Sequence, residues 1–235
     1  MRSENRPDEF VSFDERRAVR IYQRNLPHWR QEGCTYFVTF RLIDSIPANV
    51  REHWEWEKSQ WLNRHGISYD GEGGTWRAKF SRLPEDERTR FEKHFNRQVQ
   101  GCLDRSLGRC RLRDCSCITI VRQELFRHDM NNYHLGDFVI MPNHVHALLT
   151  PIAPHKLELG MKSIKGASAI ACNRVRREAG SFWQPDTYDH IVRTLEQLDA
   201  FRQYISANPA MAGIELPAEG VYRASWLDAW FTGGG

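Results

Sequence analysis

The sequence lacks several features that mark other classes of protein. No apolar segment approaches the ~20 residues that a membrane-spanning helix needs. The first residues are charged and contain no apolar core, which argues against a secretory signal. No long internal repeat is visible in the 235 residues. These absences predict a globular protein that stays in the cytoplasm, with enough chain to bury the core of one large domain.

Lysine is also scarce. Six of the 33 basic residues are lysine and the other 27 are arginine, while the formal net charge is only +3. Arginine binds phosphate through two parallel hydrogen bonds and stacks on bases, so this bias is compatible with a nucleic-acid partner. GC-rich coding produces the same bias without any function. Composition alone therefore leaves the partner open.

Paired cysteines of the kind that hold zinc are missing too. The chain has six cysteines, and without a secretory signal they are expected to be free thiols. Cys110, Cys115 and Cys117 lie close together in the sequence but form no paired CxxC motif. No second pair follows them, so the spacing argues against a zinc site.

The most informative segment reads DFVIMPNHVHALLTP and runs from Asp137 to Pro151. It places His144 and His146 two residues apart inside an apolar run that is typical of a strand. Side chains alternate between the two faces of a strand, so both imidazoles project from one face. Two such imidazoles suit a single divalent metal ion. A lone histidine pair of this kind is also often only hydrogen-bonded, so a third ligand is needed.

The segment YISAN, from Tyr204 to Asn208, offers a third ligand and a reacting group. Residues four apart share a helix face, so the phenol and the amide point the same way. A tyrosine hydroxyl can attack a phosphodiester and form a covalent phosphotyrosine. A divalent metal beside it would polarise the phosphoryl oxygen. Tyr188 is a competing nucleophile, but Val192, four residues further on, is no ligand.

The hydrophobic pattern predicts an α+β fold, in which helices cover an antiparallel sheet. Strands are expected over 35–42, 133–140 and 145–150, the last two forming an antiparallel pair. Helices are expected over 50–61, 84–103, 117–130, 157–178 and 193–207. The last helix is predicted to stop at Asn208-Pro209, because proline cannot continue a helix.

Taken in order, the segments of the chain resemble the REP-associated tyrosine transposases, a group of single-tyrosine HUH transposases. The resemblance is carried by YFVTFR (36–41), CRLRD (110–114), MPNHVHALLTP (141–151), LGMKSIKGASAIACNR (159–174), FWQPDTYDHIVR (182–193) and YISANPAMAGI (204–214). It implies a basic N-terminal arm (1–33), a catalytic domain (34–215) with a helical insertion at about 48–107, and a C-terminal tail (216–235).

The resemblance also implies a fold and a chemistry. The sheet would be ferredoxin-like, with the histidine pair on a central strand. His144, His146 and Asn208 would bind Mg²⁺ or Mn²⁺, and Tyr204 would be the nucleophile. Tyr204 would take the 5′ phosphate of single-stranded hairpin DNA and release a 3′ hydroxyl. Position and charge suggest further phosphate contacts at Lys162, Lys165, Arg174 and Arg193.

Several alternatives stay open at this point. A domesticated relative would bind folded single-stranded repeats without cutting them. A metal-dependent hydrolase would use the histidines to hold a reactive water and would need an acidic ligand nearby, for which Asp137 is the candidate. The sequence does not decide between a monomer and a homodimer, nor whether Tyr204 serves the histidines of its own chain.

Overall fold

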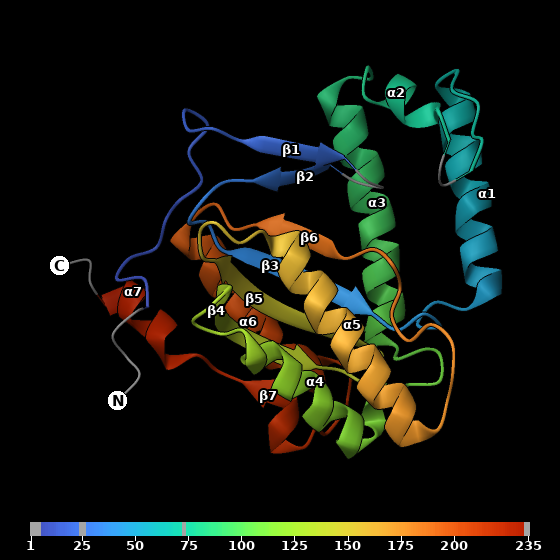
Figure 1. Ribbon diagram of the computed structural model, residues 1–235. Helices are drawn as coiled ribbons and strands as arrows, with labels where there is room; N and C mark the ends of the chain where they lie inside the picture. The colour runs from blue at the N-terminus through green and yellow to red at the C-terminus, as the bar shows by residue number, and fades with distance from the viewer. Residues whose placement is uncertain (1–5, 24–26, 72–73, 233–235) are drawn as a thin grey trace. The chain divides into compact units, whose positions relative to one another are not determined.

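The computed structural model describes residues 6–23, 27–71 and 74–232. The chain divides into two compact units (Figure 1). Unit 1 consists of Met1–Ile43 and Cys110–Gly235, and unit 2 consists of Asp44–Arg109. The predicted catalytic histidines and tyrosine all belong to unit 1.

Unit 1 is built around a five-stranded antiparallel sheet. Its strands lie in the order β6-β3-β5-β4-β7, so β5 is the central strand. Their bounds are β3 (Tyr36–Arg41), β4 (Tyr133–Ile140), β5 (His144–Pro151), β6 (Tyr188–Ile191) and β7 (Val221–Tyr222). A separate two-stranded sheet pairs β1 (Arg20–Gln23) with β2 (Pro27–Arg30). The sequence pattern predicted β3, β4 and β5 but missed the four shorter strands.

The connections of the sheet are those of a ferredoxin-like fold. Helix α4 (Cys115–Arg127) joins β3 to β4, and helix α5 (Leu157–Arg176) joins β5 to β6. Each helix thus connects two strands that have another strand between them, in the split β-α-β arrangement. The predicted α+β fold with a ferredoxin-like sheet is confirmed.

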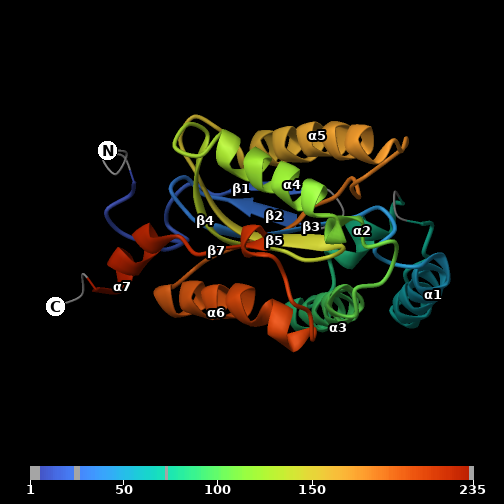
Figure 2. The same ribbon diagram turned by 90° about the horizontal axis from the view of Figure 1, so that it is seen from below.

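Helices cover both faces of this sheet (Figure 2). Helices α4 and α5 lie on one face, and α6 (Leu195–Met211) lies on the other. The alternation along β3 sorts its side chains accordingly: Val38 and Phe40 pack in the core beneath α4 and α5. Phe37 instead joins the core beneath α6, together with Leu198 and Ile205 of that helix.

Helix α6 does not stop where the sequence predicts. The Thr194 side chain accepts a hydrogen bond from the backbone N–H of Gln197 and caps the start of the helix. At the other end the helix continues through Pro209 to Met211. The chain turns at Gly213, whose φ is +63°, and the N–H of Ile214 donates to the carbonyl of Pro209. This is a Schellman C-cap, so the glycine rather than the proline ends the helix.

Strand β4 carries a bulge that shapes the α6 face. Its register against β5 shifts between Leu135 and Phe138, which leaves Gly136 and Asp137 opposite one residue. A Cβ atom at Gly136 would lie 2.8 Å from the Cβ of Leu148 and 3.1 Å from the carbonyl oxygen of Leu148. Glycine is therefore required by close approach of the neighbouring strand.

Unit 2 is helical and has its own apolar core. It contains α1 (Ala48–Arg64), α2 (Trp76–Phe80) and α3 (Glu85–Asp104). Trp54 and Leu62 of α1 pack in one cluster with Trp76 of α2 and with Phe91 and Phe95 of α3. The tryptophans Trp54 and Trp76 thus serve packing in this unit.

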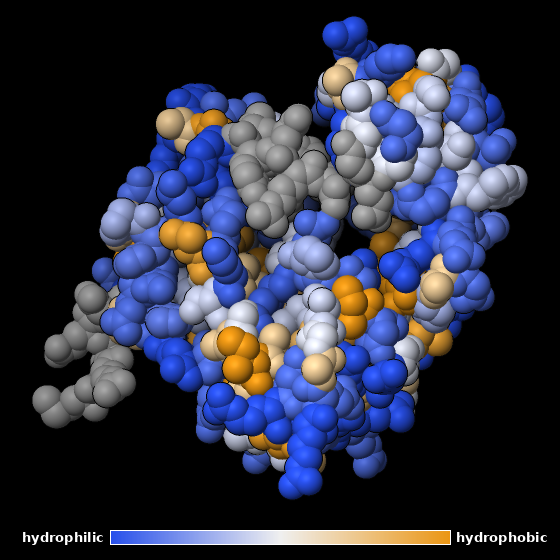
Figure 3. All heavy atoms as spheres, turned by 45° about the vertical axis from the view of Figure 1, so that its right-hand side comes forward, coloured by the Kyte–Doolittle hydropathy of each residue, from blue (hydrophilic) through white to orange (hydrophobic). Residues whose placement is uncertain are grey.

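Short elements complete unit 1. They are the 3₁₀ helices η1 (Arg111–Arg113), η2 (Ala218–Gly220) and η3 (Ser225–Asp228) and the helix α7 (Ala229–Thr232). The visible face in Figure 3 is mostly hydrophilic, with hydrophobic side chains in small patches. Within the described ranges, no helix is both long and apolar enough to cross a membrane.

We predict that Gly136→Ala lowers the free energy of unfolding by about 1–3 kcal/mol, because the new methyl group overpacks the strand against Leu148. Chemical denaturation measures the change. Gly166→Ala in α5 is the matched control, since a Cβ there meets nothing within 4 Å. It should leave stability unchanged or raise it by up to about 1 kcal/mol, as expected for a helical glycine. Equal stability of the two variants would contradict the close packing at Gly136.

Candidate active site

The two histidines of the central strand meet at a buried point. His144 and His146 both lie in β5 and are fully buried. Their Nε2 atoms are 3.0 Å apart. The predicted pairing of the two imidazoles on one face of a strand is thus present, on the face where Tyr204 of α6 contacts His146.

The outer ring nitrogens are held by oxygen atoms. His144 Nδ1 lies 2.7 Å from Oδ1 of Asn143. His146 Nδ1 lies 2.7 Å from Oγ1 of Thr39 on the neighbouring strand. When each Nδ1 carries the proton and donates to its oxygen, the lone pairs of both Nε2 atoms face each other. This tautomer is the one that lets two imidazoles bind one metal ion.

Helix α6 brings Tyr204 to this pair. The Tyr204 hydroxyl oxygen is 3.4 Å from Nε2 of His146 in the same chain. Phe37 stacks on the His146 ring, with centroids 5.1 Å apart, and also on Phe201 of α6 at 4.3 Å. The stack fixes the helix over the strand, so the tyrosine lies beside histidines of its own chain.

The side chain of Asn208 is a candidate third metal ligand. It lies one helical turn beyond Tyr204, is buried, and its side-chain Oδ1 has no hydrogen-bond partner. A buried oxygen without a partner is costly unless something binds it. Two imidazole nitrogens and one amide oxygen fit a divalent ion with mixed ligands. In the described parts of the chain, no three histidine, cysteine or acidic residues cluster in a way that could hold a metal.

Asp137, the acidic candidate of the hydrolase alternative, is engaged elsewhere. Its Oδ2 accepts a hydrogen bond from Nε of Arg202 at 2.9 Å, and its Oδ1 accepts one from the Ala224 N–H at 2.8 Å. Both side chains of the ion pair are 3% exposed. A carboxylate held in this way links α6 to the β4 bulge and is poorly suited to serve as a ligand or base.

Part of the chain is similar to a known family. Residues 121–208 match the model of the IS200-like transposase family. The match covers less than half of the chain. It begins in α4 and ends at Asn208, and so contains the histidine pair, the tyrosine and the asparagine.

Individual relatives are distant. An uncharacterized protein of Haemophilus influenzae is 25% identical over 155 residues, which cover 51% of this chain and 86% of the relative. A solved structure of a REP-associated tyrosine transposase bound to a REP hairpin is 16% identical, with a TM-score of 0.41. The match covers 82% of this chain and 73% of that one. A solved structure of a candidate transposase from Deinococcus radiodurans is 16% identical, with a TM-score of 0.32. The match covers 74% of this chain and 89% of that one.

The predicted phosphate contacts do not gather at the candidate active site. Lys162 and Arg174 are exposed on α5, which lies on the opposite face of the sheet from α6 (Figure 2). Lys165 donates to the carbonyl oxygen of Pro185 at 2.8 Å and so ties α5 to the segment before β6. Arg193 is exposed, with its guanidinium 5.1 Å from the ring centroid of Phe13.

Sequence reasoning missed the residues that orient the histidines. Thr39 is a polar residue at an α6-facing position of β3, and Asn143 directly precedes His144. The role of Thr39 could be found only from the register of β3 against β5, in which Thr39 is the Cα partner of His146.

Burial keeps both histidines neutral. It lowers the pKa of His144 from 6.5 to about 3. Burial, together with the neighbouring His144, also lowers the pKa of His146 well below 6.5. Neutral imidazoles are the form that binds metal ions, so the apolar surroundings favour the ligand state.

The depressed histidine pKa values predict a dependence of stability on pH in the metal-free protein. Between pH 6.5 and about 3 the unfolded chain binds a proton at His144 that the folded chain does not. The free energy of unfolding is therefore highest above pH 6.5 and falls as pH drops, by up to about 1.4 kcal/mol per unit for each histidine.

Denaturant titrations between pH 7 and 4.5, with a chelator present, measure this slope. His144→Gln should show a shallower fall than the unmodified chain, because one of the histidines whose pKa falls on folding is gone. Parallel pH profiles for the two proteins would contradict the burial of a neutral His144.

Proposed function

We propose that this chain is a single-tyrosine HUH transposase of the REP-associated type, which cleaves and rejoins single-stranded DNA that carries hairpins. The observation that supports the proposal most directly is the 3.4 Å approach of the Tyr204 hydroxyl to His146, whose Nε2 lies 3.0 Å from that of His144. A nucleophile thus lies beside two imidazoles that share one face of a central strand.

The proposed reaction is a phosphoryl transfer to tyrosine. The Tyr204 oxygen forms a bond to phosphorus while the bond from phosphorus to the 3′ oxygen breaks. The phenol loses its proton, and the 3′ oxygen gains one and leaves as a hydroxyl. The 5′ phosphate stays on the tyrosine. Because the phosphotyrosine keeps the energy of the broken ester, a second 3′ hydroxyl can reverse the step without ATP.

We assign His144, His146 and Asn208 as the residues that hold a divalent ion, Mg²⁺ or Mn²⁺. The ion would polarise a phosphoryl oxygen and orient the phosphate for in-line attack. Thr39 and Asn143, each with an oxygen 2.7 Å from a histidine Nδ1, would hold the imidazoles in the ligand tautomer. The amide oxygen of Asn208, which has no hydrogen-bond partner, is the third donor.

The substrate class rests on the segments shared with REP-associated transposases, which imply folded single-stranded repeats. The α5 cations Lys162 and Arg174 stay predicted phosphate contacts. Because they lie on the other face of the sheet, they would serve a part of the DNA other than the phosphate that is cut. Two functions that the sequence left open, binding without cleavage and metal-dependent hydrolysis, are outcomes of the tests below.

We predict that the chain, incubated with Mn²⁺ and labelled hairpin DNA from the sequence that flanks its own gene, forms a covalent protein–DNA complex. A denaturing gel detects the complex. Tyr204→Phe should remove the complex and change the affinity for DNA by less than about twofold, because only one hydroxyl is lost and the ring remains.

Tyr188→Phe is the matched control, since it removes the hydroxyl of the competing tyrosine. It should form the complex at the same rate as the unmodified chain. Loss of the complex in Tyr188→Phe but not in Tyr204→Phe would mean that Tyr188, and not Tyr204, is the nucleophile. A native gel shift without any covalent complex would favour a protein that only binds, and cleavage without a covalent complex would favour a hydrolase.

We predict that Thr39→Val weakens Mn²⁺ binding by about 10- to 100-fold, because His146 loses the oxygen that fixes its tautomer. Isothermal titration calorimetry measures the affinity. Thr39→Ser keeps the hydroxyl and should bind Mn²⁺ like the unmodified chain. Equal Mn²⁺ affinities of the valine and serine variants would show that the Thr39 hydroxyl does not support metal binding.

A further inference from the structure

One row of side chains runs across the sheet on the histidine face. In the register of the strands, Tyr188 of β6 pairs with Thr39 of β3, and Thr39 pairs with His146 of β5. Paired residues of neighbouring strands project to the same side. Tyr188 is therefore on the same face as the catalytic histidines and is 37% exposed at the edge of the sheet.

Arg41 occupies the next row on the same face. It is the Cα partner of His144 and follows Phe37 and Thr39 at intervals of two along β3. Phe37 packs under α6 and Thr39 contacts His146, so alternation places Arg41 on that face as well. Its backbone is fixed from one side by the N–H of Gln184, which donates to the Arg41 carbonyl at 2.9 Å.

The two residues have the chemistry that single-stranded DNA requires. A guanidinium binds phosphate oxygens through two parallel hydrogen bonds. An aromatic ring at the surface stacks on any base, whatever the sequence. Arg41 is adjacent to His144 across one strand boundary, and Tyr188 lies two strands from His146, at about 10 Å for strands ~4.8 Å apart. This separation suits a neighbouring nucleotide and is too long for Tyr188 to be the nucleophile.

We propose that Arg41 and Tyr188 form a contact strip for the DNA strand beside the nicking site, with Arg41 on a backbone phosphate and Tyr188 stacked on a base. The strip rests on the proposed function, because it assumes that single-stranded DNA crosses the histidine face. The strip also defines where the bound DNA would lie. The single-stranded DNA would run from the histidine pair across β3 to β6 at the edge of the sheet.

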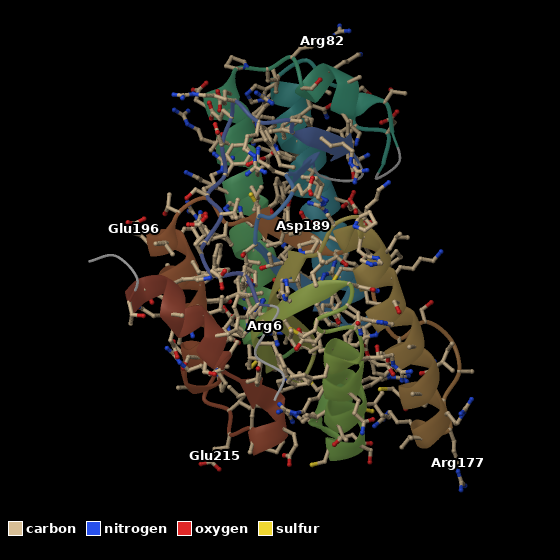
Figure 4. The ribbon with its side chains drawn as sticks, turned by 60° about the vertical axis from the view of Figure 1, so that its left-hand side comes forward. Arg6, Arg82, Arg177, Asp189, Glu196 and Glu215 are labelled. Carbon is tan, nitrogen blue, oxygen red and sulfur yellow. The ribbon has the colours of Figure 1, made fainter. Side chains whose placement is uncertain are left out.

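Binding measurements in a Tyr204→Phe background test the strip without cleavage. The probe is the hairpin oligonucleotide from the gene's own flank, with 2-aminopurine placed at each unpaired position in turn. Arg41→Gln should reduce the slope of log K against log salt by about 0.7, the value for one phosphate contact on a single strand. Arg177→Gln is the control, because Arg177 lies at the far end of α5 and points away from the sheet (Figure 4).

Tyr188→Leu should weaken binding by roughly 5- to 150-fold, the range for loss of one stacked base. It should also abolish the fluorescence quenching at one 2-aminopurine position. Tyr188→Phe keeps the ring and should retain both the affinity and the quenching. Circular dichroism confirms that each variant is folded before it is compared.

The outcomes separate the strip from the proposed function. An unchanged salt slope in Arg41→Gln overturns the phosphate contact, and unchanged quenching in Tyr188→Leu overturns the stacking contact. If these variants bind like their parent while the chain with Tyr204 intact forms the covalent complex, the strip is wrong and the nicking activity stands. If the variants lose binding as expected but no covalent complex forms, the strip stands and the nicking activity is wrong.

Discussion

The candidate site depends on one constraint, the position in which α6 packs against the central sheet. The histidines belong to β5, whereas Tyr204 and Asn208 belong to a helix far along the chain. Arg202 of that helix forms a buried ion pair with Asp137, and the β-bulge at Gly136 places Asp137 opposite it. Removing one partner of a buried pair costs about 3–5 kcal/mol, because a charge stays behind in an apolar interior. The pair therefore determines where the helix lies along the strand.

The apolar surroundings then set the chemistry. Stacked Phe37 and Phe201 exclude water from one side of His146, and burial holds both imidazoles in the neutral form. Interactions with a phosphate are stronger in such a place than in water. Because the histidines are fully buried while Tyr204 is only partly so, the proposed DNA substrate would reach the pair from the tyrosine side or after α6 has shifted.

Much of this site could be predicted from the sequence, since it depends on local periodicity. The spacing of two places His144 and His146 on one face of a strand, and the spacing of four places Tyr204 and Asn208 on one face of a helix. The strand of Thr35–Leu42 was also predictable, as its aromatic and β-branched residues favour a strand. Thr39, Asn143 and Asp137 acquire their roles only through contacts between elements, which depend on register and on a bulge. A sequence does not display these directly.

Other predictions failed for equally physical reasons. Pro209 was expected to end α6, but the helix runs on to Met211 and the chain turns at Gly213, where a positive φ is available. Strand β6 and the strands of the arm and the tail have two to four residues each, too few for an alternation to show. The face of the sheet that α5 covers follows from the handedness of its connection and not from its own residues, so the sequence did not show that Lys162 and Arg174 lie on the opposite face from the histidines.

The central claim is that Tyr204 becomes bonded to DNA beside the histidines of its own chain. The most direct measurement is tandem mass spectrometry of the covalent complex after digestion with trypsin and a nuclease, which identifies the residue that carries the nucleotide. The account predicts a phosphonucleotide on Tyr204 alone, in the peptide that begins at Gln203. A nucleotide on Tyr188, on a histidine or on any other residue would contradict it.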